Sequence, residues 1–331
     1  MDEKAAEAPA DAADPPPNGA LDPRLVAACY RVLLGREPEA ADVVSSKARL
    51  GGFEELLTDF VRSSEFGRRT SEYVRDRYGH PLGEVQVHVR PDQLARMFER
   101  IRSQWARLGD VDPYWSVLTD EAFRGPRLDD GLRDQFYATG AATAELIDTV
   151  AARCGVTVDP QGVCLELGCG VGRVTAHLAR RFRRVVAVDI SAGNLSLCRE
   201  MLVRCGIDNV EAVQVHSPAD VGALPHFDFL FSTIVLQHNP PPVQYYLLDT
   251  LLKKVSACGG FLFQLPTHMP DYEFRAEDYL ASAMDDMELH CLPMAEVFRL
   301  LARRRLQPLE VLMDGWTGVY GSHTFFGVKR P

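Results

Sequence analysis

A glycine-rich turn between an apolar strand and a helix constrains the fold of this chain more than any other feature. Residues 163–173 read V-C-L-E-L-G-C-G-V-G-R, with glycines at 168, 170 and 172. Glycine permits a tight turn, and the first N–H groups of the following helix can face a ligand there. A dinucleotide fingerprint needs G-x-G-x-x-G, whereas this turn has G-x-G-x-G followed by Arg173. The turn therefore predicts a ligand cradle, and its spacing disfavours a nicotinamide enzyme.

Strands and helices alternate from this turn towards the end of the chain. We expect strands at 163–167, 185–190, 210–215, 229–232, 261–265, 309–312 and 324–329. We expect helices at about 171–181, 194–205 and 244–255. Buried apolar strands joined by helices imply an α/β fold with a Rossmann-like, doubly wound, mostly parallel seven-stranded sheet. The ligand is expected at the carboxyl ends of the strands, at the topological switch point.

Two acids flank the expected cradle. Glu166 lies two residues before the first glycine, where its carboxylate can meet an ammonium group. Asp189 ends the second predicted strand in V-V-A-V-D-I-S, 17 residues after Gly172, and an acid there can accept both ribose hydroxyls. The two acids favour an amino-acid-bearing nucleoside over a pyrophosphate.

These segments, together with F-D-F-L-F-S-T-I-V-L-Q-H-N-P-P-P at 227–242, resemble class I S-adenosylmethionine-dependent methyltransferases. The resemblance covers residues 136–331 and implies S-adenosylmethionine as cofactor and S-adenosylhomocysteine as product. It places Glu166 and the loop glycines at the methionine end, Asp189 at the ribose and Ile190 at the adenine. The implied cofactor-binding residues are Tyr137, Gly140, Glu166, Gly168, Cys169, Gly170, Gly172, Arg173, Asp189, Ile190, Ser217 and Val235.

One cofactor contact of the family has no matching residue here. The loop after the third strand usually supplies an acid to the adenine amine, but it reads V-H-S-P-A-D, with His216 and Ser217 at that point. Asp220 or a backbone carbonyl is the alternative contact.

Gln237 and His238 follow the fourth predicted strand, beside the expected methyl group. Methyl transfer to a hydroxyl is an in-line displacement, which requires aligned reactants and a group that accepts the hydroxyl proton. Histidine, with an ordinary pKa of about 6.5, suits that task. We therefore expect His238 to be the catalytic base; the alternative is a histidine that caps a helix or shapes the pocket.

Other segments are expected to lie at the same end of the sheet, near the methyl group, and to contact the acceptor. The candidate substrate residues are Gln237, His268, Tyr272, His290 and Trp316. A metal-dependent transfer through Asp285, Asp286 and His290 is the alternative, but their spacing matches no metal motif, so we predict no metal site.

The first 135 residues differ in composition from the rest. We expect a disordered acidic tail at 1–22, a helical accessory domain at 23–85 and a helical linker or lid at 86–135, followed by the methyltransferase domain at 136–331. The linker contains W-A-R-L-G-D-V-D-P-Y-W-S-V-L-T, which is either a packing element or one wall of the acceptor pocket.

The accessory domain carries a second resemblance. L-V-A-A-C-Y-R-V-L-L-G-R-E-P and L-G-G-F-E-E-L-L-T-D-F-V-R-S-S-E-F are similar to a bacterial helical family of unknown function, which is related to phycobilisome linker modules. That family often accompanies enzymes of cell-surface polysaccharide assembly. The match covers residues 23–68 and departs at A-A-D-V-V-S-S-K. It implies docking of a biosynthetic partner, formation of homo-oligomers, or simple packing on the enzyme.

Charge and cysteine content restrict the partners. The net charge of −10, from 36 basic and 46 acidic residues, argues against a nucleic-acid partner. Eight cysteines without a C-x-x-C pair predict a reducing cytoplasm with neither disulfides nor zinc. No apolar run approaches the roughly 18 residues of a membrane span, and we expect no secretory signal.

Together these features predict a cytoplasmic bacterial methyltransferase. By analogy with polysaccharide biosynthesis clusters, the expected reaction is O-methylation of a sugar hydroxyl on a glycan or nucleotide sugar. The alternatives are O- or N-methylation of a small natural product, and a cofactor-binding scaffold without turnover.

Overall fold

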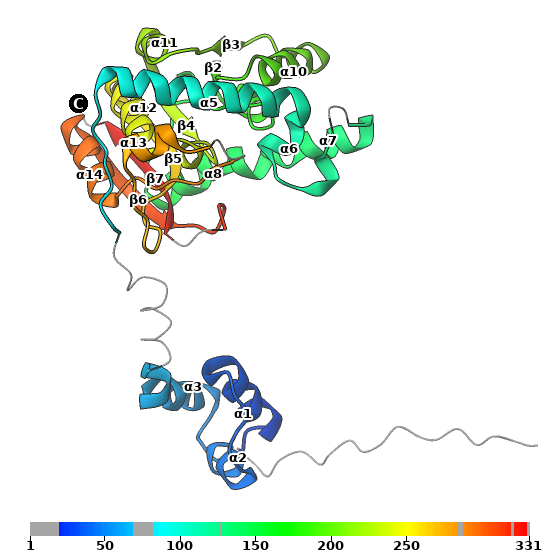
Figure 1. Ribbon diagram of the computed structural model, residues 1–331. Coiled ribbons are helices and arrows are strands. Elements are labelled where there is room, and N and C mark those ends of the chain that lie inside the picture. The colour runs from blue at the N-terminus through cyan, green and yellow to red at the C-terminus, as the bar shows by residue number, and fades with distance from the viewer. Residues whose placement is uncertain (1–19, 69–81, 126–127, 284–286, 319–320, 330–331) are drawn as a thin grey trace, which may run out of the picture. The chain divides into compact units, whose positions relative to one another are not determined.

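The computed structural model of the chain describes residues 20–68, 82–125, 128–283, 287–318 and 321–329. The chain divides into two compact units, Met1–His80 and Pro81–Pro331 (Figure 1). Of the predicted tail at 1–22, all but the last three residues lie outside the described part of the chain. The predicted linker or lid at 86–135 lies within the second unit.

The first unit is helical, as the sequence predicts. Its described elements are α1 (Pro23–Cys29), the π-helical turn η1 (Tyr30–Leu34), α2 (Ala41–Lys47) and α3 (Phe53–Arg62). Val26, Leu56 and Phe60 are buried at the centre, where the rings of Tyr30 and Phe60 meet edge to face, 4.8 Å apart. The apolar residues at helical spacing therefore form a small core of their own.

The second unit is built on a seven-stranded sheet in the order β3-β2-β1-β4-β5-β7-β6. The strands are β1 (Val163–Leu167), β2 (Arg184–Asp189), β3 (Val210–Gln214), β4 (Phe227–Ser232), β5 (Val255–Pro266), β6 (Leu306–Met313) and β7 (Ser322–Lys329). The first five pair in parallel, and β7 runs antiparallel to both β5 and β6. This is the predicted doubly wound sheet, and its order reverses between β1 and β4.

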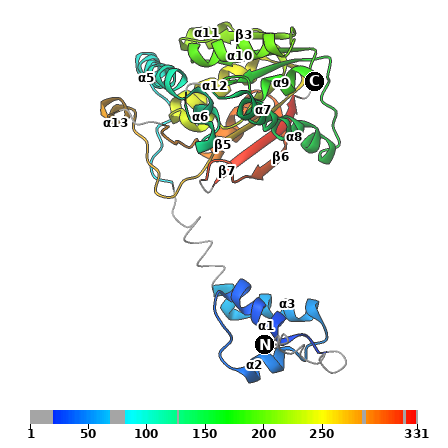
Figure 2. The same cartoon turned by 90° about the vertical axis from the view of Figure 1, so that its right-hand side faces the viewer.

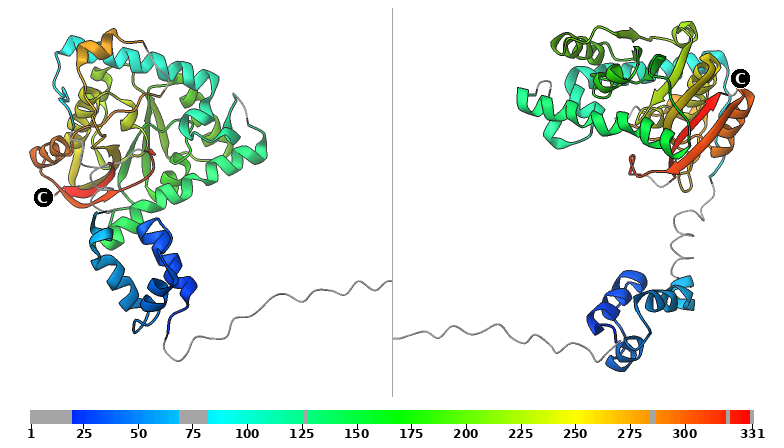
Figure 3. Two further views of the ribbon diagram at one scale, coloured as in Figure 1. Left: turned by 60° about the horizontal axis from the view of Figure 1, so that its bottom comes forward. Right: turned by 180° about the vertical axis from the view of Figure 1, so that it is seen from behind.

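Helices cover both faces of the sheet (Figures 2 and 3). They are α5 (Pro91–Val111), α6 (Pro113–Val117), η2 (Glu121–Phe123), α7 (Asp130–Ala138), α8 (Gly140–Arg153), α9 (Thr175–Arg181), α10 (Ala192–Arg204), α11 (Pro218–Ala223), η3 (Leu236–His238), α12 (Pro241–Lys254), α13 (Ala276–Ala281) and α14 (Met294–Arg303). Side chains of α5, α11, α12 and α14 form one core with the sheet, and those of α8, α9 and α10 form the other. Among the described helices, none is both long and apolar enough to cross a bilayer.

The helix expected at about 171–181 begins later than predicted. It starts at Thr175 because the preceding loop keeps positive φ angles as far as Gly172. A helix can begin only where the backbone returns to right-handed angles. The longer loop leaves more backbone at the carboxyl end of β1.

Candidate active site

A cavity of about 970 Å³, counting its open mouth, lies at the carboxyl ends of β1, β2 and β4. This is where a doubly wound sheet binds its ligand. Among the predicted site residues, those in its wall are Glu166, Gly168, Cys169, Gly170, Arg173, Asp189, Ile190, Val235 and His238. The structure therefore brings together the predicted base and most of the predicted cofactor contacts.

The glycine loop has no room for side chains at two positions. Gly168 and Gly170 have φ angles of 75° and 54°, which residues with a Cβ rarely adopt. A Cβ at Gly168 would overlap Val235, and a Cβ at Gly170 would overlap Val117 of α6. The loop thus lies directly against the walls of the cavity.

The two predicted acids are fixed by hydrogen bonds. Glu166 is buried and accepts a bond from the Thr175 hydroxyl at 2.6 Å. Its burial raises the pKa of the carboxyl to about 7, against the opposing effects of Thr175 and the Arg173 charge. Asp189 accepts backbone N–H bonds from Gly170 and Ser191, both at 2.8 Å, and burial raises its pKa as well.

Arg173 places a buried positive charge in the same wall. Its guanidinium reaches the hydroxyls of Thr139 and Thr143 only at 3.4 and 3.5 Å, and its Nε has no partner among the described residues. Burial lowers the pKa of the guanidinium. A buried cation with weak partners is stabilised by an anionic group of a ligand.

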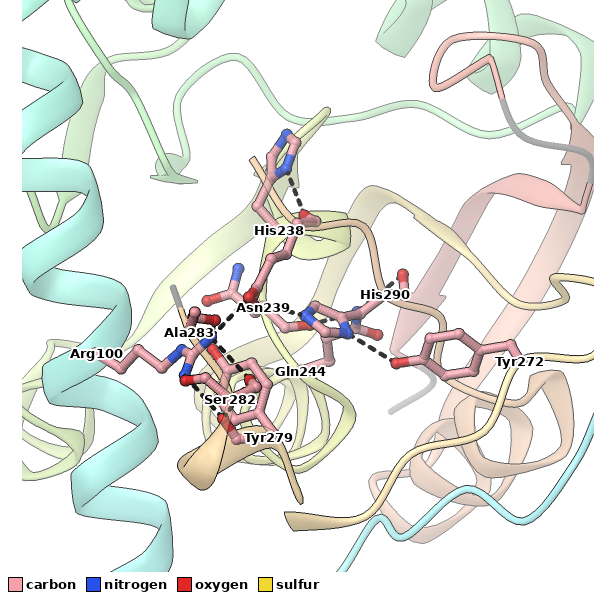
Figure 4. Close-up of polar contacts among 10 residues, drawn as sticks. Arg100, His238, Asn239, Gln244, Tyr272, Tyr279, Ser282, Ala283 and His290 are labelled. Carbon is pink, nitrogen blue, oxygen red and sulfur yellow. Dashed lines mark hydrogen bonds and ion pairs between the residues drawn. The ribbon is translucent and has the colours of Figure 1, made fainter. Parts of the chain in front are cut away.

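His238 is held in one tautomer (Figure 4). Its Nδ1 lies 3.1 Å from the Glu288 carbonyl oxygen, which can only accept, so Nδ1 carries the proton and donates. The Nε2 atom of the neutral ring therefore keeps its lone pair, towards which the Gln237 amide donates a long bond of 3.3 Å. Burial lowers the pKa of His238 to about 4, so the ring is neutral at pH 7 and able to accept a proton at Nε2.

Helices α5 and α6 supply a wall that the sequence left undecided. Phe98, Ile101 and Trp105 of α5 line the cavity, and the rings of Trp105 and His238 meet edge to face, 5.3 Å apart. Helix α5 lies close to the start of α10 at Gly109. A Cβ at that position would overlap the Ser191 hydroxyl, so only glycine fits there. The tryptophan-rich segment, through Trp105, thus forms part of the pocket wall.

Ile234 is strained where β4 ends at the cavity. It has a φ angle of 58°, which is unusual for a β-branched residue, and its N–H donates to Gln264 Oε1 at 2.8 Å. Such strain costs on the order of 1–3 kcal/mol and concentrates at functional sites. The sequence carries no signal for it, since nothing in the local pattern distinguishes Ile234 from its neighbours.

Four predicted cofactor residues lie outside the described wall. Tyr137 donates its hydroxyl to the Val171 carbonyl at 3.0 Å, and Gly140 packs against the Arg173 backbone. Gly172 faces α10 rather than the cavity. Ser217 caps α11, because its side chain accepts a bond from the Asp220 N–H. In the loop after β3, Val215 rather than Ser217 lines the cavity.

The candidate substrate residues also lie outside the described wall. Gln237 is buried with its amide beside His238 Nε2, and the Tyr272 hydroxyl lies 2.8 Å from His290 Nδ1. His268 is half-buried, and Trp316 is 39% exposed on the loop between β6 and β7. Tyr272 and His290 do converge as predicted, but on each other.

Residues 164–259 match a family model described as a methyltransferase domain. The 23S rRNA (uracil(1939)-C(5))-methyltransferase of Xanthomonas campestris pv. campestris is 27% identical over 196 residues, covering 58% of this chain and 43% of that protein. Trans-aconitate 2-methyltransferase of Azoarcus sp. is 33% identical over 122 residues, covering 36% of this chain and 45% of that protein. This chain therefore spans less than half the length of either relative.

A solved structure also resembles this chain. It is the 1,6-didemethyltoxoflavin-N1-methyltransferase of Burkholderia thailandensis with bound 1,6-didemethyltoxoflavin and S-adenosylhomocysteine, at 17% identity and a TM-score of 0.48, covering 77% of this chain and 97% of that one. The family match identifies residues 164–259 as a methyltransferase domain, and the sheet that contains them has the doubly wound strand order. The cofactor of such methyltransferase domains is S-adenosylmethionine.

Proposed function

We propose that this protein transfers a methyl group from S-adenosylmethionine to a hydroxyl of a small acceptor held in the cavity. One observation carries the proposal: a glycine cradle with charged groups of both signs shares a cavity with a neutral histidine. The charged groups suit a zwitterionic nucleoside, and the histidine suits a neutral nucleophile that must lose a proton.

The residues present fit the cofactor. Glu166 would hold its ammonium group, Arg173 its carboxylate and Asp189 its ribose hydroxyls. The unpaired Nε of the buried Arg173 supports its part, because that charge lacks a strong partner among the described residues. When bound, the cofactor supplies an electrophilic methyl group on a sulfonium.

The chain itself supplies orientation and a base. His238 Nε2 would take the proton of the acceptor hydroxyl, and the cavity wall would orient that oxygen towards the methyl group. Trp105 and Val235 line the cavity with His238 and keep water from the reacting atoms. The Gln237 amide moves off Nε2 as the acceptor hydroxyl takes its place.

A sugar hydroxyl, on a glycan or a nucleotide sugar, is the first acceptor to test. Trp105 offers an aromatic surface inside the cavity, whereas the predicted substrate residue Trp316 lies outside the described wall. A small natural product is the alternative that the same wall favours. Methylation of RNA, the reaction in the name of the Xanthomonas relative, is disfavoured by the net charge of −10.

The remaining parts of the proposal concern the cell. We place the protein in the cytoplasm, where its free cysteines stay reduced. The first unit is proposed to dock a biosynthetic partner or to join copies of the chain. Sedimentation of the full chain at several concentrations distinguishes these roles, because only the second makes mass depend on concentration.

Ligand-dependent unfolding tests the cofactor. A ligand at about 100 times its Kd adds roughly 2.7 kcal/mol to stability and raises the melting midpoint by a few degrees. We expect such a shift with S-adenosylmethionine and S-adenosylhomocysteine, and none with NAD or NADP. Neutral sugars, nucleotide sugars, small phenols and RNA are then screened by methyl mass gain. Cofactor binding without turnover on any of them would favour the scaffold alternative.

A further inference from the structure

Glu288 connects α5, which lines the cavity, with the proposed base. Its side chain forms an ion pair with Arg100 of α5 at 2.7 Å, and its backbone carbonyl accepts the Nδ1–H of His238 at 3.1 Å. Both charged side chains are largely buried, at 12% exposure for Arg100 and 16% for Glu288. The ion pair therefore lies close to the peptide that orients the imidazole.

Arg100 ties α5 to the chain segment that precedes this peptide. Its guanidinium donates to the carbonyls of Tyr279, Ser282 and Ala283 at 2.8 to 2.9 Å, and it stacks on the Tyr279 ring at 4.3 Å. Five donated bonds and a ring contact are far more than a solubilising surface arginine makes. Arg100 therefore acts as a fixed anchor.

A second set of bonds holds residues 288–290 from the other side. His290 Nε2 lies 3.4 Å from Glu288 Oε2, and the Tyr272 hydroxyl lies 2.8 Å from His290 Nδ1. The His290 N–H donates to the Gln237 carbonyl at 2.8 Å, which aligns this segment with η3. Burial raises the pKa of Glu288, but the bonds from His290 and Arg100 outweigh it and keep the pKa below its usual value. Glu288 is thus ionised and held from both sides.

We propose that Arg100 and Glu288 are positioning residues that select the Nδ1–H tautomer of His238 and couple it to the seating of α5. The proposal rests on the proposed role of His238 as base. Phe98, Ile101 and Trp105 lie on the same helix as Arg100 and line the cavity, so one helix both closes the pocket and holds the base in its accepting form. Without the Glu288 carbonyl in place, the ring is free to carry its proton on Nε2, where it offers the acceptor no lone pair.

The direct test is the tautomer itself. Nitrogen-15 NMR of histidine-labelled protein, with S-adenosylhomocysteine present, distinguishes a protonated from an unprotonated ring nitrogen, and His238→Gln assigns the signal. We expect the full chain to show Nδ1 protonated and Nε2 unprotonated. In Arg100→Gln we expect a mixture of tautomers, faster amide exchange at His290 and unchanged affinity for S-adenosylhomocysteine. We also expect a roughly 10- to 100-fold lower kcat, by analogy with the loss of a partner that orients a metal-ligating histidine.

Two further variants separate positioning from general stability. Arg304→Gln removes another arginine–carboxylate pair, with Asp249, whose bonds of 2.6 and 3.0 Å lie outside the described cavity wall. We expect it to lower stability without changing the tautomer or kcat. Arg100→Lys keeps the charge but not the planar set of donors, and should restore the tautomer only in part. It also provides a readout if Arg100→Gln does not fold.

The outcomes separate this inference from the proposed function. A His238 that keeps its Nδ1–H tautomer in both Arg100 variants would overturn the positioning role, whatever the activity. A tautomer that shifts in Arg100→Gln, while His238→Gln retains full turnover, would support the positioning contact and refute His238 as the base.

Discussion

The backbone N–H of Gly170 donates to the carboxylate of Asp189 at 2.8 Å, which joins the glycine loop after β1 to the end of β2. Asp189 therefore has a structural task besides its proposed contact with ribose. Its other oxygen accepts the Ser191 N–H, so both carboxylate oxygens are oriented before any ligand arrives. Preorganised groups bind with a smaller entropic cost.

Asp189→Asn should weaken cofactor binding, because an amide has one oxygen and cannot accept both backbone bonds. Losing a bond to a charged group costs about 1.5–3 kcal/mol, so we expect the Kd for S-adenosylhomocysteine to rise roughly 10- to 100-fold by calorimetry. Asp228→Asn is the control, since Asp228 accepts the Val163 N–H at the opposite end of β1. An equal loss of affinity in both variants would contradict a specific role for Asp189.

Gly170→Ala should abolish the cradle. The alanine would combine a disfavoured φ of 54° with an overlap against Val117. Gly155→Ala is the matched control, because Gly155 has a φ of 65° but open space around it. We expect the control to lose about 1–2 kcal/mol of stability with unchanged affinity, and Gly170→Ala to lose at least tenfold in affinity as well. Denaturant unfolding and calorimetry measure the two effects, and similar affinities in the two variants would refute the overlap.

The loop and the end of β2 could be predicted from sequence because their determinants are local. Gly168 and Gly170 follow one short apolar strand and Asp189 ends the next, and parallel strands bring their carboxyl ends together. The α5 wall could not be placed in the same way. The spacing of apolar residues around Trp105 predicts an amphipathic helix, but it does not indicate which face of that helix lines the cavity. The hydrogen bond between Tyr272 and His290 could not be predicted either, because it depends on the directions of the two side chains.

The turnover rate should be flat across neutral pH. Burial lowers the pKa of His238 to about 4, so the fraction of neutral ring, and with it kcat at saturating cofactor and acceptor, should stay constant from about pH 8 down to 5.5. The rate should fall only as the pH approaches 4. A midpoint near 6.5, as for an exposed histidine, would show that the ring is not desolvated in the working enzyme.

Cofactor binding should release a proton near neutral pH. Burial raises the pKa of Glu166 to about 7, so part of the protein carries a protonated Glu166 at that pH, whereas an ammonium group binds the ionised form. Affinity should therefore rise as the pH rises through about 7. Calorimetry in buffers of different ionisation enthalpy counts the proton, and Glu166→Gln should remove both the release and the pH dependence. Equal binding heats in every buffer would contradict the prediction.

The two tryptophans of the α5–α6 segment should differ in effect. Trp105 lines the cavity, whereas Trp115 lies under the Arg124 guanidinium at 4.1 Å and outside the described wall. Trp105→Ala should raise KM for the acceptor about tenfold or more, with little change in cofactor affinity, because it removes an aromatic contact. Trp115→Ala should lower stability alone. Steady-state kinetics, with the acceptor identified by mass gain, distinguish the two variants. An equal rise in KM in both variants would contradict the placement of Trp105 at the acceptor.

The anchoring of α5 by Arg100 has a consequence for how the protein is made. The partners of Arg100 lie 179 to 188 residues later in the chain, whereas Gly170 and Asp189 are 19 residues apart. Contacts between distant residues form late, and synthesis proceeds from the N-terminus. On the ribosome, the cradle is therefore assembled well before its wall and its base are secured. A nascent chain can hold the cofactor pocket in outline while the catalytic half of the site still awaits the last sixth of the sequence.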